Sequence, residues 1–284
     1  MIGFINIIKP AGISSAKAVA IVKKKLGTPC GHMGTLDPMA SGVLPIGVGK
    51  TSRLFDYLLD KKKTYIATFR FGILTDTLDT TGEITETSLK IPTKEEIESK
   101  LSGFVGEISQ IPPKYSAKCV GGAKSYSLAR RGVEYELPPK NVTVLSFRLI
   151  NQISDNEFEF EITCKGGTYI RSLARDLGYA VNSLAVMSAL TRTESGIFNM
   201  ENGVELKEFE ATENPEKYLI KSDSSISYPK LVLDEVQSIR LLNGLKDKLG
   251  FESGLYRVYD REEFLGVGEV TDGVLKIKAY VREN

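Results

Sequence analysis

The sequence has few of the residues that hold metal ions or form disulfide frameworks. It contains three cysteines and one histidine among 284 residues. Cys30, Cys119 and Cys164 are odd in number, lie far apart and form no C-x-x-C pair, which argues against a disulfide framework and against a zinc site. We therefore expect no metal and a reducing, cytoplasmic setting.

Long apolar runs are also absent. No run approaches the roughly 18 residues that a membrane-spanning helix requires, and the first residues alternate like a strand rather than like a signal peptide. The composition, 42% hydrophobic and 26% charged, is that of a soluble globular protein with room for one large and one small domain. We expect no membrane association.

The chain has little net charge, +1 at pH 7, but its charges are unevenly distributed. Residues 1–70 contain eleven Lys or Arg and three acidic residues, so they carry +8 and the remainder carries −7. A basic segment fits a polyanionic partner. A solvated surface without a binding role explains the same charges equally well.

The most informative stretch that is present covers residues 31–46, GHMGTLDPMASGVLPI. It holds the only histidine, His32, and one acid, Asp37, among small and apolar neighbours. Its three glycines and two prolines exclude a regular helix or strand over the whole length, so we expect an ordered loop. An acid in such surroundings needs a partner or a chemical role. The alternative is that Asp37 caps a turn and His32 is structural.

The following segment, GVGKTS at 47–52, matches the end of a phosphate-binding loop. That motif requires glycine at the position of Leu44, and Pro45 removes an amide that would hold phosphate. A nucleotide hydrolase is therefore disfavoured. We expect a helix from about Thr51 to Leu59 instead.

Hydrophobic patterning predicts the remaining elements. We expect strands at 3–8, 64–71, 142–150 and 158–164, and helices at 15–25, 93–101 and 180–190. Ser14 or Ser15 caps the first helix and Thr93 the second. Residues 222–227 are expected to be a linker, and short strands at 255–259, 264–270 and 274–278 predict a small β-barrel.

The loop string G-H-x-G-T-L-D-P-x-A-S-G-V-L-P closely resembles the signature of the TruB family of tRNA pseudouridine synthases. One departure is Met33, where the family commonly has a small polar residue. Further matches are K-P-x-G-x-S-S at 9–15, K-x-Y at 63–65, G-x-x-T-D-T-x-D-x-x-G at 72–82, K-G-T-Y-I-R-S-L-x-x-D-L-G within 164–178 (here with two glycines), and L-x-R-T-x-x-G-x-F at 190–198. The resemblance covers nearly the whole chain.

This resemblance implies a catalytic role for three residues: Asp37, Tyr65 and Arg171. Asp37 would be the essential carboxylate, and the Tyr65 ring would stack on the target base. Arg171 would clamp Asp37 and keep it ionised. Without the resemblance, Tyr65 is as easily a core aromatic and Arg171 an exposed helix residue.

Contact with the substrate is implied for four further residues: Lys9, His32, Tyr169 and Leu190. Lys9 would lie near the active site, His32 would help to hold the deformed RNA loop, Tyr169 would pack beside the base, and Leu190 would form an apolar wall of the uracil pocket. Local pattern alone does not separate Leu190 from an ordinary core leucine, or the segment at Lys9 from an ordinary turn.

Basic residues interleaved with tyrosine over about 112–140 suit contact with phosphates and bases, and the family has a mobile thumb at this place. An ordinary surface loop is the alternative. We expect these residues to bind RNA: Lys61, Lys62, Lys63, Lys114, Lys124, Tyr126, Arg130 and Arg131.

The implied fold is α+β. A mixed, largely antiparallel sheet flanked by helices and loops would form a catalytic domain over 1–225, and 228–284 would form a small PUA-like β-barrel that binds RNA.

The implied activity is isomerisation of the uridine at position 55 in the T loop of tRNA, with the base flipped out of its stack. Because the net change is an isomerisation, we expect no cofactor. The expected partner is the T stem-loop, with no obligatory protein partner and a monomeric enzyme. Asp37 acts either as a nucleophile or as a base. A pure RNA-binding protein, and a relative acting on ribosomal RNA within a guide-RNA complex, remain as alternatives.

Overall fold

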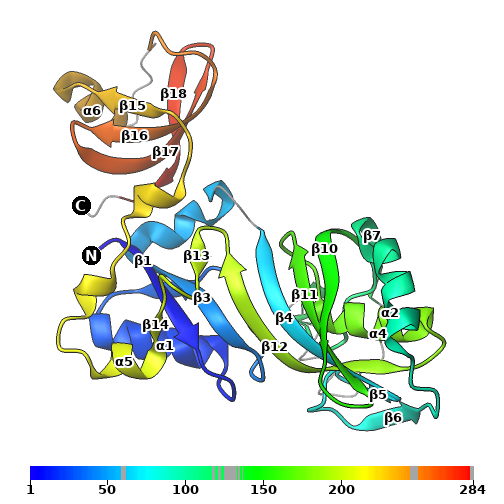
Figure 1. Ribbon diagram of the computed structural model, residues 1–284. Helices are drawn as coiled ribbons and strands as arrows, with labels where there is room; N and C mark the ends of the chain where they lie inside the picture. The colour runs from blue at the N-terminus through cyan, green and yellow to red at the C-terminus, as the bar shows by residue number, and fades with distance from the viewer. Residues whose placement is uncertain are drawn as a thin grey trace. The chain divides into compact units, whose positions relative to one another are not determined.

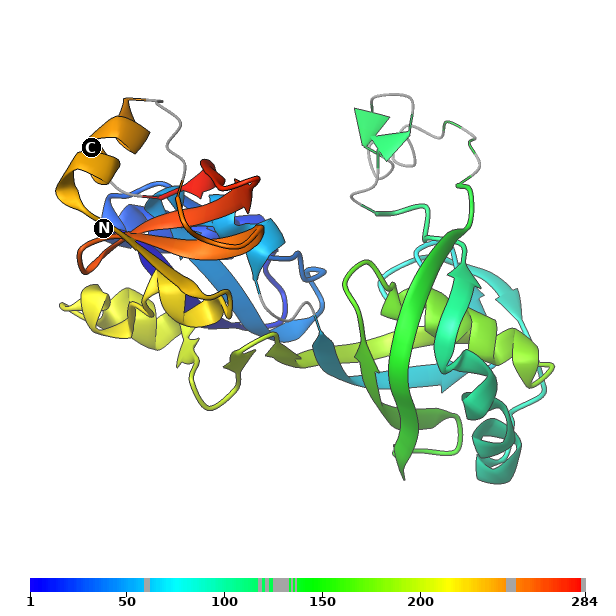
Figure 2. The same cartoon turned by 90° about the horizontal axis from the view of Figure 1, so that it is seen from above.

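A computed structural model describes residues 1–58, 62–116, 119–120, 123–124, 133, 135, 137–243 and 249–281. The chain divides into two compact units. Unit 1 comprises residues 1–38, 42–61 and 195–284, and unit 2 comprises residues 39–41 and 62–194. Figures 1 and 2 show the elements of each unit from two directions.

The elements of the first 110 residues are β1 (Gly3–Lys9), α1 (Ser15–Leu26), β2 (Cys30–His32), β3 (Ser41–Val48), η1 (Gly49–Tyr57), β4 (Lys63–Phe71), β5 (Ile73–Thr75), β6 (Ile84–Thr87), α2 (Lys94–Leu101), η2 (Ser102–Phe104) and β7 (Gly106–Gln110). The next are β8 (Cys119–Val120), β9 (Ala123–Lys124), β10 (Lys140–Gln152), β11 (Glu157–Cys164), α4 (Ile170–Ala180) and β12 (Ala185–Ser195). The last are β13 (Phe198–Asn199), β14 (Val204–Glu205), α5 (Leu206–Ala211), η3 (Pro215–Tyr218), η4 (Ser222–Ser225), β15 (Lys230–Leu233), α6 (Glu235–Leu242), β16 (Gly254–Asp260), β17 (Glu263–Thr271) and β18 (Val274–Tyr280).

In unit 1, β1 is the strand around which the N-terminal residues assemble. It pairs antiparallel with β3 and parallel with β14, and β2 pairs antiparallel with β3. Every residue of β1 is buried, as its apolar sequence predicts. The first helix forms as expected: the Ser14 hydroxyl accepts from the amide of Lys17, and Gly27 ends the helix with a φ of 61°.

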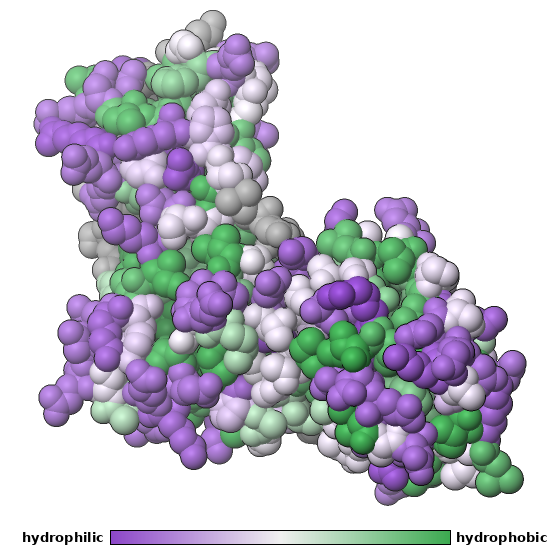
Figure 3. All heavy atoms as spheres, viewed as in Figure 1, coloured by the Kyte–Doolittle hydropathy of each residue, from purple (hydrophilic) through white to green (hydrophobic). Residues whose placement is uncertain are grey.

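The C-terminal part of unit 1 is a separate sheet in the order β15-β16-β17-β18. The β15–β16 pair is parallel and the other two pairs are antiparallel. Three of the four strands match the predicted short strands, but the sheet is open in the part of the chain that is described, so a closed barrel is not confirmed. In β18, Leu275 and Ala279 are buried while Lys276 and Lys278 are exposed, and Figure 3 shows many hydrophilic side chains on this sheet.

Unit 2 has the strand order β12-β4-β11-β10-β7, with a two-stranded β5–β6 sheet beside it. The β4–β11, β11–β10 and β10–β7 pairs are antiparallel. Its core contains the rings of Phe69, Phe147 and Phe160, whose centroids lie 4.8–6.1 Å apart. Helices α2 and α4 contact each other, and they pack against β10 and β4 respectively. The mixed α+β fold with a largely antiparallel sheet is as predicted.

Three local predictions differ from the structure. The expected helix at 180–190 is wrong, because these residues enter strand β12, where sheet pairing overrides the helix propensity of Ala, Leu and Met. The helix expected from Thr51 is a 3-10 helix over Gly49–Tyr57. The linker expected at 222–227 contains η4, and its Ile226 is 2% exposed.

Some predicted positions lie outside the described residues: Lys61, Tyr126, Arg130 and Arg131. Lys124 is described only as part of the backbone of β9. Among the described helices, none combines the length and apolar character needed to cross a membrane.

Candidate active site

The candidate site residues fall into two groups, one in each unit. Unit 1 contains Lys9, His32 and Asp37, and unit 2 contains Tyr65, Tyr169, Arg171 and Leu190. The predicted pairing of Arg171 with Asp37 joins the two groups and stays a prediction.

Asp37 is half-buried in the loop between β2 and β3, and the residues on both sides of it are anchored. The Ser15 hydroxyl accepts from the amide of Leu36 and donates to its carbonyl, both at 2.8 Å. The amide of Gly12 donates to the carbonyl of Pro38 at 2.8 Å. Gly12 has a φ of 88°, which favours glycine at this turn. The loop is therefore ordered, as expected, and its order comes from the turn after β1.

Lys9 is completely buried at the end of β1. Its ammonium group donates to the carbonyls of Pro10 and Ile13, at 2.9 and 2.7 Å, and lies 3.5 Å from the carbonyl of Pro38. These carbonyls offset the cost of burying the charge. Lys9 therefore ties the turn to the loop, and its predicted contact with substrate stays a prediction.

His32 ends β2, where it lies opposite Ile46 of β3 and is half-buried. The next residue, Met33, is 3% exposed and belongs to a hydrophobic cluster with Phe4 and Leu54. Its amide donates to the carbonyl of Pro45 at 2.8 Å. The departure from the family string at Met33 thus extends the apolar core beside the loop.

In unit 2, Arg171 is buried on the first turn of α4 and contacts three groups. Its guanidinium donates to the carbonyls of Thr77 and Tyr115, at 2.8 and 2.9 Å, and its Nη1 lies 3.5 Å from the Asp79 carboxylate. Sequence reasoning identified Arg171 but not Asp79 as its ionic partner. One signal in the sequence could have identified it. Asp79 is the second aspartate of T-D-T-x-D, and no basic residue lies near it in the sequence to pair with it.

The Asp79 carboxylate is itself held by neighbouring threonines. It accepts from the hydroxyl of Thr77 at 2.8 Å and from the amide of Thr81 at 3.0 Å. The carboxylate therefore faces Arg171 in a fixed position. Charge-assisted hydrogen bonds of this kind restrain a buried ion pair better than the 3.5 Å contact alone.

Tyr169 directly precedes α4, and Gln110 at the end of β7 holds its backbone. The Gln110 side chain accepts from the amide of Tyr169 at 2.9 Å and donates to its carbonyl at 3.1 Å. Ser172 of α4 also donates to the carbonyl of Ile111 at 2.8 Å. The helix that carries Arg171 is thus fixed to the strand that leads into the predicted thumb.

Tyr65 and Leu190 are both 7% exposed, on β4 and β12 respectively. Near Tyr65, burial and the adjacent Arg192 lower the pKa of Lys63 to about 8. Burial raises the pKa of the nearby Cys164 thiol to about 11, so this cysteine is a poor nucleophile. Lys62 is more exposed and lies 3.8 Å from the Glu194 carboxylate.

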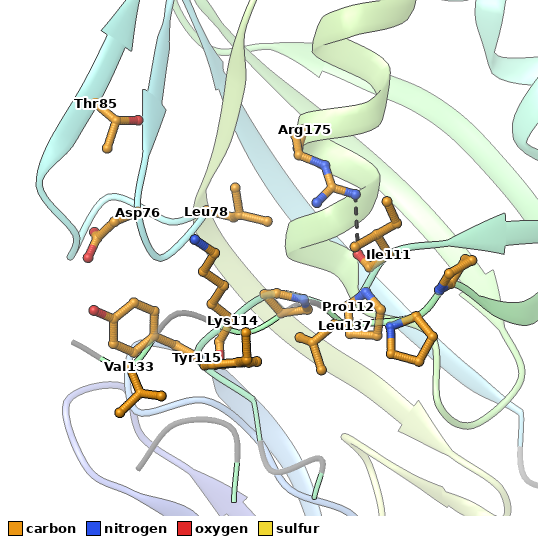
Figure 4. A pocket seen from close by; sticks show the side chains of 14 residues that line it. Asp76, Leu78, Thr85, Ile111, Pro112, Lys114, Tyr115, Val133, Leu137 and Arg175 are labelled. Carbon is orange, nitrogen blue, oxygen red and sulfur yellow. Dashed lines mark hydrogen bonds between the residues drawn. The ribbon is translucent and has the colours of Figure 1, made fainter. Parts of the chain in front are cut away.

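A cavity of about 1330 Å³ opens beside the partners of Arg171. Figure 4 shows Asp76, Leu78 and Thr85 on one side of it and Lys114 and Tyr115 on another, while Arg175 donates to the carbonyl of Ile111. Apolar walls come from prolines and aliphatic residues at both ends of the predicted thumb: Ile111, Pro112, Pro113, Val133, Leu137, Pro138 and Pro139. Tyr65, Tyr169 and Leu190 are not in its lining.

The described residues also bear on the phosphate-loop interpretation of residues 47–52. In a phosphate loop, the hydroxyl at the position of Thr51 would bind a metal ion. Here Thr51 is fully buried. Its hydroxyl accepts from the amide of Gly3 at 3.0 Å and donates to the carbonyl of Val48 at 2.8 Å, so it is already used within the fold. Within the described part of the chain, no three His, Cys, Asp or Glu side chains gather as metal ligands do.

Comparison with known sequences gives two matches to family profiles. Residues 22–170 match the N-terminal domain of the TruB family pseudouridylate synthases, and residues 229–279 match the C-terminal region of pseudouridine synthase II TruB.

Individual proteins are similar over nearly the full length. A tRNA pseudouridine synthase B of Clostridium kluyveri is 38% identical over 99% of this chain and 100% of its own length. The protein of the same name from Caldanaerobacter subterraneus is 39% identical over 94% of each chain. A crystal structure of a Cbf5-Nop10-Gar1 complex contains a chain that is 26% identical, with a TM-score of 0.68, covering 94% of this chain and 78% of that one.

Proposed function

The chain belongs to the TruB family of pseudouridylate synthases, and from this membership we propose that it isomerises uridine to pseudouridine in the T loop of tRNA. The observation that carries the proposal is the similarity, over nearly the whole chain, to proteins named tRNA pseudouridine synthase B. The target is the uridine at position 55, and the base leaves its stack to reach the enzyme.

The reaction needs only rearrangement of one nucleotide. The N1–C1′ bond breaks, the uracil turns over, and a C5–C1′ bond forms. The proton on C5 then leaves to solvent while N1 gains one, so atoms and electrons balance without a cofactor.

Asp37 supplies the carboxylate in this proposal. It either attacks the nucleotide or removes the 2′ proton, and both roles require it to be ionised and held still. The anchoring of Leu36 and Pro38 supports this role. In this proposal Arg171 pairs with Asp37, Tyr65 stacks on the base, and Tyr169 and Leu190 flank it. Lys9 and His32 contribute to substrate binding.

Binding of the tRNA backbone is assigned to the basic residues near the site and on the thumb at about 112–140: Lys61, Lys62, Lys63, Lys114, Lys124, Tyr126, Arg130 and Arg131. Of these, Lys63 is the least suited to a permanent charge, because burial lowers its pKa to about 8. Contact with a phosphate would raise this pKa.

The proposed division of labour is catalysis by residues 1–225 and RNA binding by a PUA-like region over 228–284. The exposed Lys276 and Lys278 support the second part. We further propose a monomer that needs no protein partner and acts in the cytoplasm, where its substrate is found. The relatives matched along their full length are named as tRNA enzymes, which favours this over a role in a guide-RNA complex.

The test measures tritium release from unmodified tRNA that carries C5-tritiated uridine, with wild-type protein and Asp37→Asn side by side. We expect wild type to release tritium without any added protein or guide RNA, and Asp37→Asn to release at least 1,000-fold less. A transcript with cytidine at position 55 is the substrate control. Tight binding without release by either protein would favour the RNA-binding alternative, and release at other uridines would overturn the site assignment.

A further inference from the structure

Ser15 makes a contact that its place in the helix does not require. It is the first residue of α1, yet the hydroxyl that caps this helix belongs to Ser14. The Ser15 hydroxyl instead turns toward the loop, and its side chain is 2% exposed. There it bonds to both backbone polar groups of Leu36, twenty-one residues along the chain, at 2.8 Å each.

These two bonds satisfy both the amide and the carbonyl of Leu36, as a neighbouring strand would do. A buried amide and carbonyl must find partners, and a single serine hydroxyl serves as acceptor for one and donor to the other. The Leu36 side chain is also buried, so water is not available to replace Ser15. The backbone at Leu36 is therefore set by this one side chain.

The other neighbour of Asp37 is held by the same turn. The Pro38 carbonyl accepts from the amide of Gly12 at 2.8 Å and lies 3.5 Å from the ammonium group of Lys9. Asp37 thus lies between two anchored residues, each one Cα step of about 3.8 Å away. A shift of either anchor moves the carboxylate.

We propose that Ser15 is a positioning residue for the Asp37 carboxylate, acting through the backbone of Leu36. This inference rests on the proposed function, in which Asp37 is the reacting acid. The Ser15 hydroxyl bonds to the backbone of Leu36 and to none of the residues assigned to RNA contact, so its loss is expected to change the chemical step more than substrate binding. A misplacement of about 1 Å costs on the order of 100-fold in rate.

Two adjacent serines provide a matched test. Ser15→Ala removes the contact with the loop, and Ser14→Ala removes the helix cap, which has a similar cost in stability but no contact with the loop. We measure single-turnover tritium release, the Kd for unmodified tRNA, and the urea midpoint of unfolding. Ser15→Ala is expected to lower the single-turnover rate between 10- and 100-fold with a Kd within 2-fold of wild type. Ser14→Ala is expected to keep the wild-type rate.

Conservative variants of Ser15 distinguish a loss of loop positioning from a general loss of folding. Ser15→Thr keeps a hydroxyl and is expected to recover most of the rate, while Ser15→Cys has a similar size but a weak donor and acceptor and is expected to behave like Ser15→Ala. If Ser15→Ala is poorly folded, the comparison of Ser15→Thr with Ser15→Cys carries the test.

The outcomes are distinct. A Ser15→Ala rate within 2-fold of wild type, an equal loss in Ser14→Ala, or a loss confined to Kd would each overturn the positioning role. Failure of the proposed function has a different signature: wild type would release no tritium, or Asp37→Asn would remain active.

Discussion

Buried charge is handled in three different ways among the described residues. Lys9 is surrounded by backbone carbonyls, Arg171 has carbonyls together with the Asp79 carboxylate, and Lys63 has a pKa lowered to about 8. A buried charge without compensation costs several kcal/mol, so each solution has a different consequence. Lys9 and Arg171 fix neighbouring backbone, whereas burial makes Lys63 easier to deprotonate than an ordinary lysine.

The Asp79–Arg171 pair gives a prediction at this scale. Asp79→Asn keeps the size of the side chain but removes the charge opposite a buried guanidinium, and its amide group faces the donor amide of Thr81. We expect the free energy of unfolding to fall by about 3 kcal/mol, measured by urea denaturation. The control is Asp76→Asn in the same loop, which is half-exposed and is expected to cost less than about 1 kcal/mol. Equal losses in the two variants would contradict the importance of the buried pair.

At the scale of elements, α4 begins without a side-chain cap of its own. The Gln110 side chain holds the residue before the helix by bonding to both backbone groups of Tyr169, and the Ser172 hydroxyl donates to the carbonyl of Ile111. Strand β7 is thus connected directly to the helix that carries Arg171. The segment that follows β7 leads into the predicted thumb, so this connection lies at the base of the thumb.

Removing the side-chain bonds of Gln110 tests that connection. Gln110→Met has a similar volume but leaves the amide of Tyr169 without its partner and its carbonyl with the amide of Leu173 alone, and we expect a loss of about 2 kcal/mol in unfolding free energy. Hydrogen exchange at the first turn of α4 should become faster, and tritium release should fall several-fold. Ser109→Ala, on the same strand but exposed, is the control. Unchanged exchange in Gln110→Met would show that the helix start is held by packing alone.

Elements with local signals were predictable from the sequence, and elements decided by tertiary partners were not. The helices capped by Ser14 and Thr93 form as predicted, because a cap is a contact between near neighbours. Strand β12 was predicted as a helix, since only its place in the sheet reveals its state. In the site, the loop around Asp37 was recognisable, but Ser15 and Asp79 were not, because their partners lie 21 and 92 residues away.

At the scale of the molecule, the C-terminal sheet takes part in two separate cores. One lies within the sheet and contains Leu231, Leu265 and Leu275. The other joins Val267 of the sheet to Phe4 of β1. The second core also includes residues of the Asp37 loop, of η1 and of the segment before the sheet: Met33, Leu54 and Ile226. Within unit 1, the C-terminal sheet therefore supports the strands next to the Asp37 loop.

Two substitutions in the sheet separate these cores. Val267 and Leu231 are both fully buried, but only Val267 belongs to the core that contains Phe4 and Met33. Val267→Ala leaves a cavity beside β1 and is expected to cost roughly 2 kcal/mol, to speed hydrogen exchange of the β1 amides and to lower the rate of tritium release. Leu231→Ala costs at least as much, because it removes a larger side chain. Its cavity lies within the sheet, so hydrogen exchange in β1 should stay at the wild-type rate.

If both variants speed exchange in β1 equally, unit 1 unfolds as one cooperative body and the two cores are not independent. If neither does, β1 and the loop that it supports are stable without the support of the C-terminal sheet.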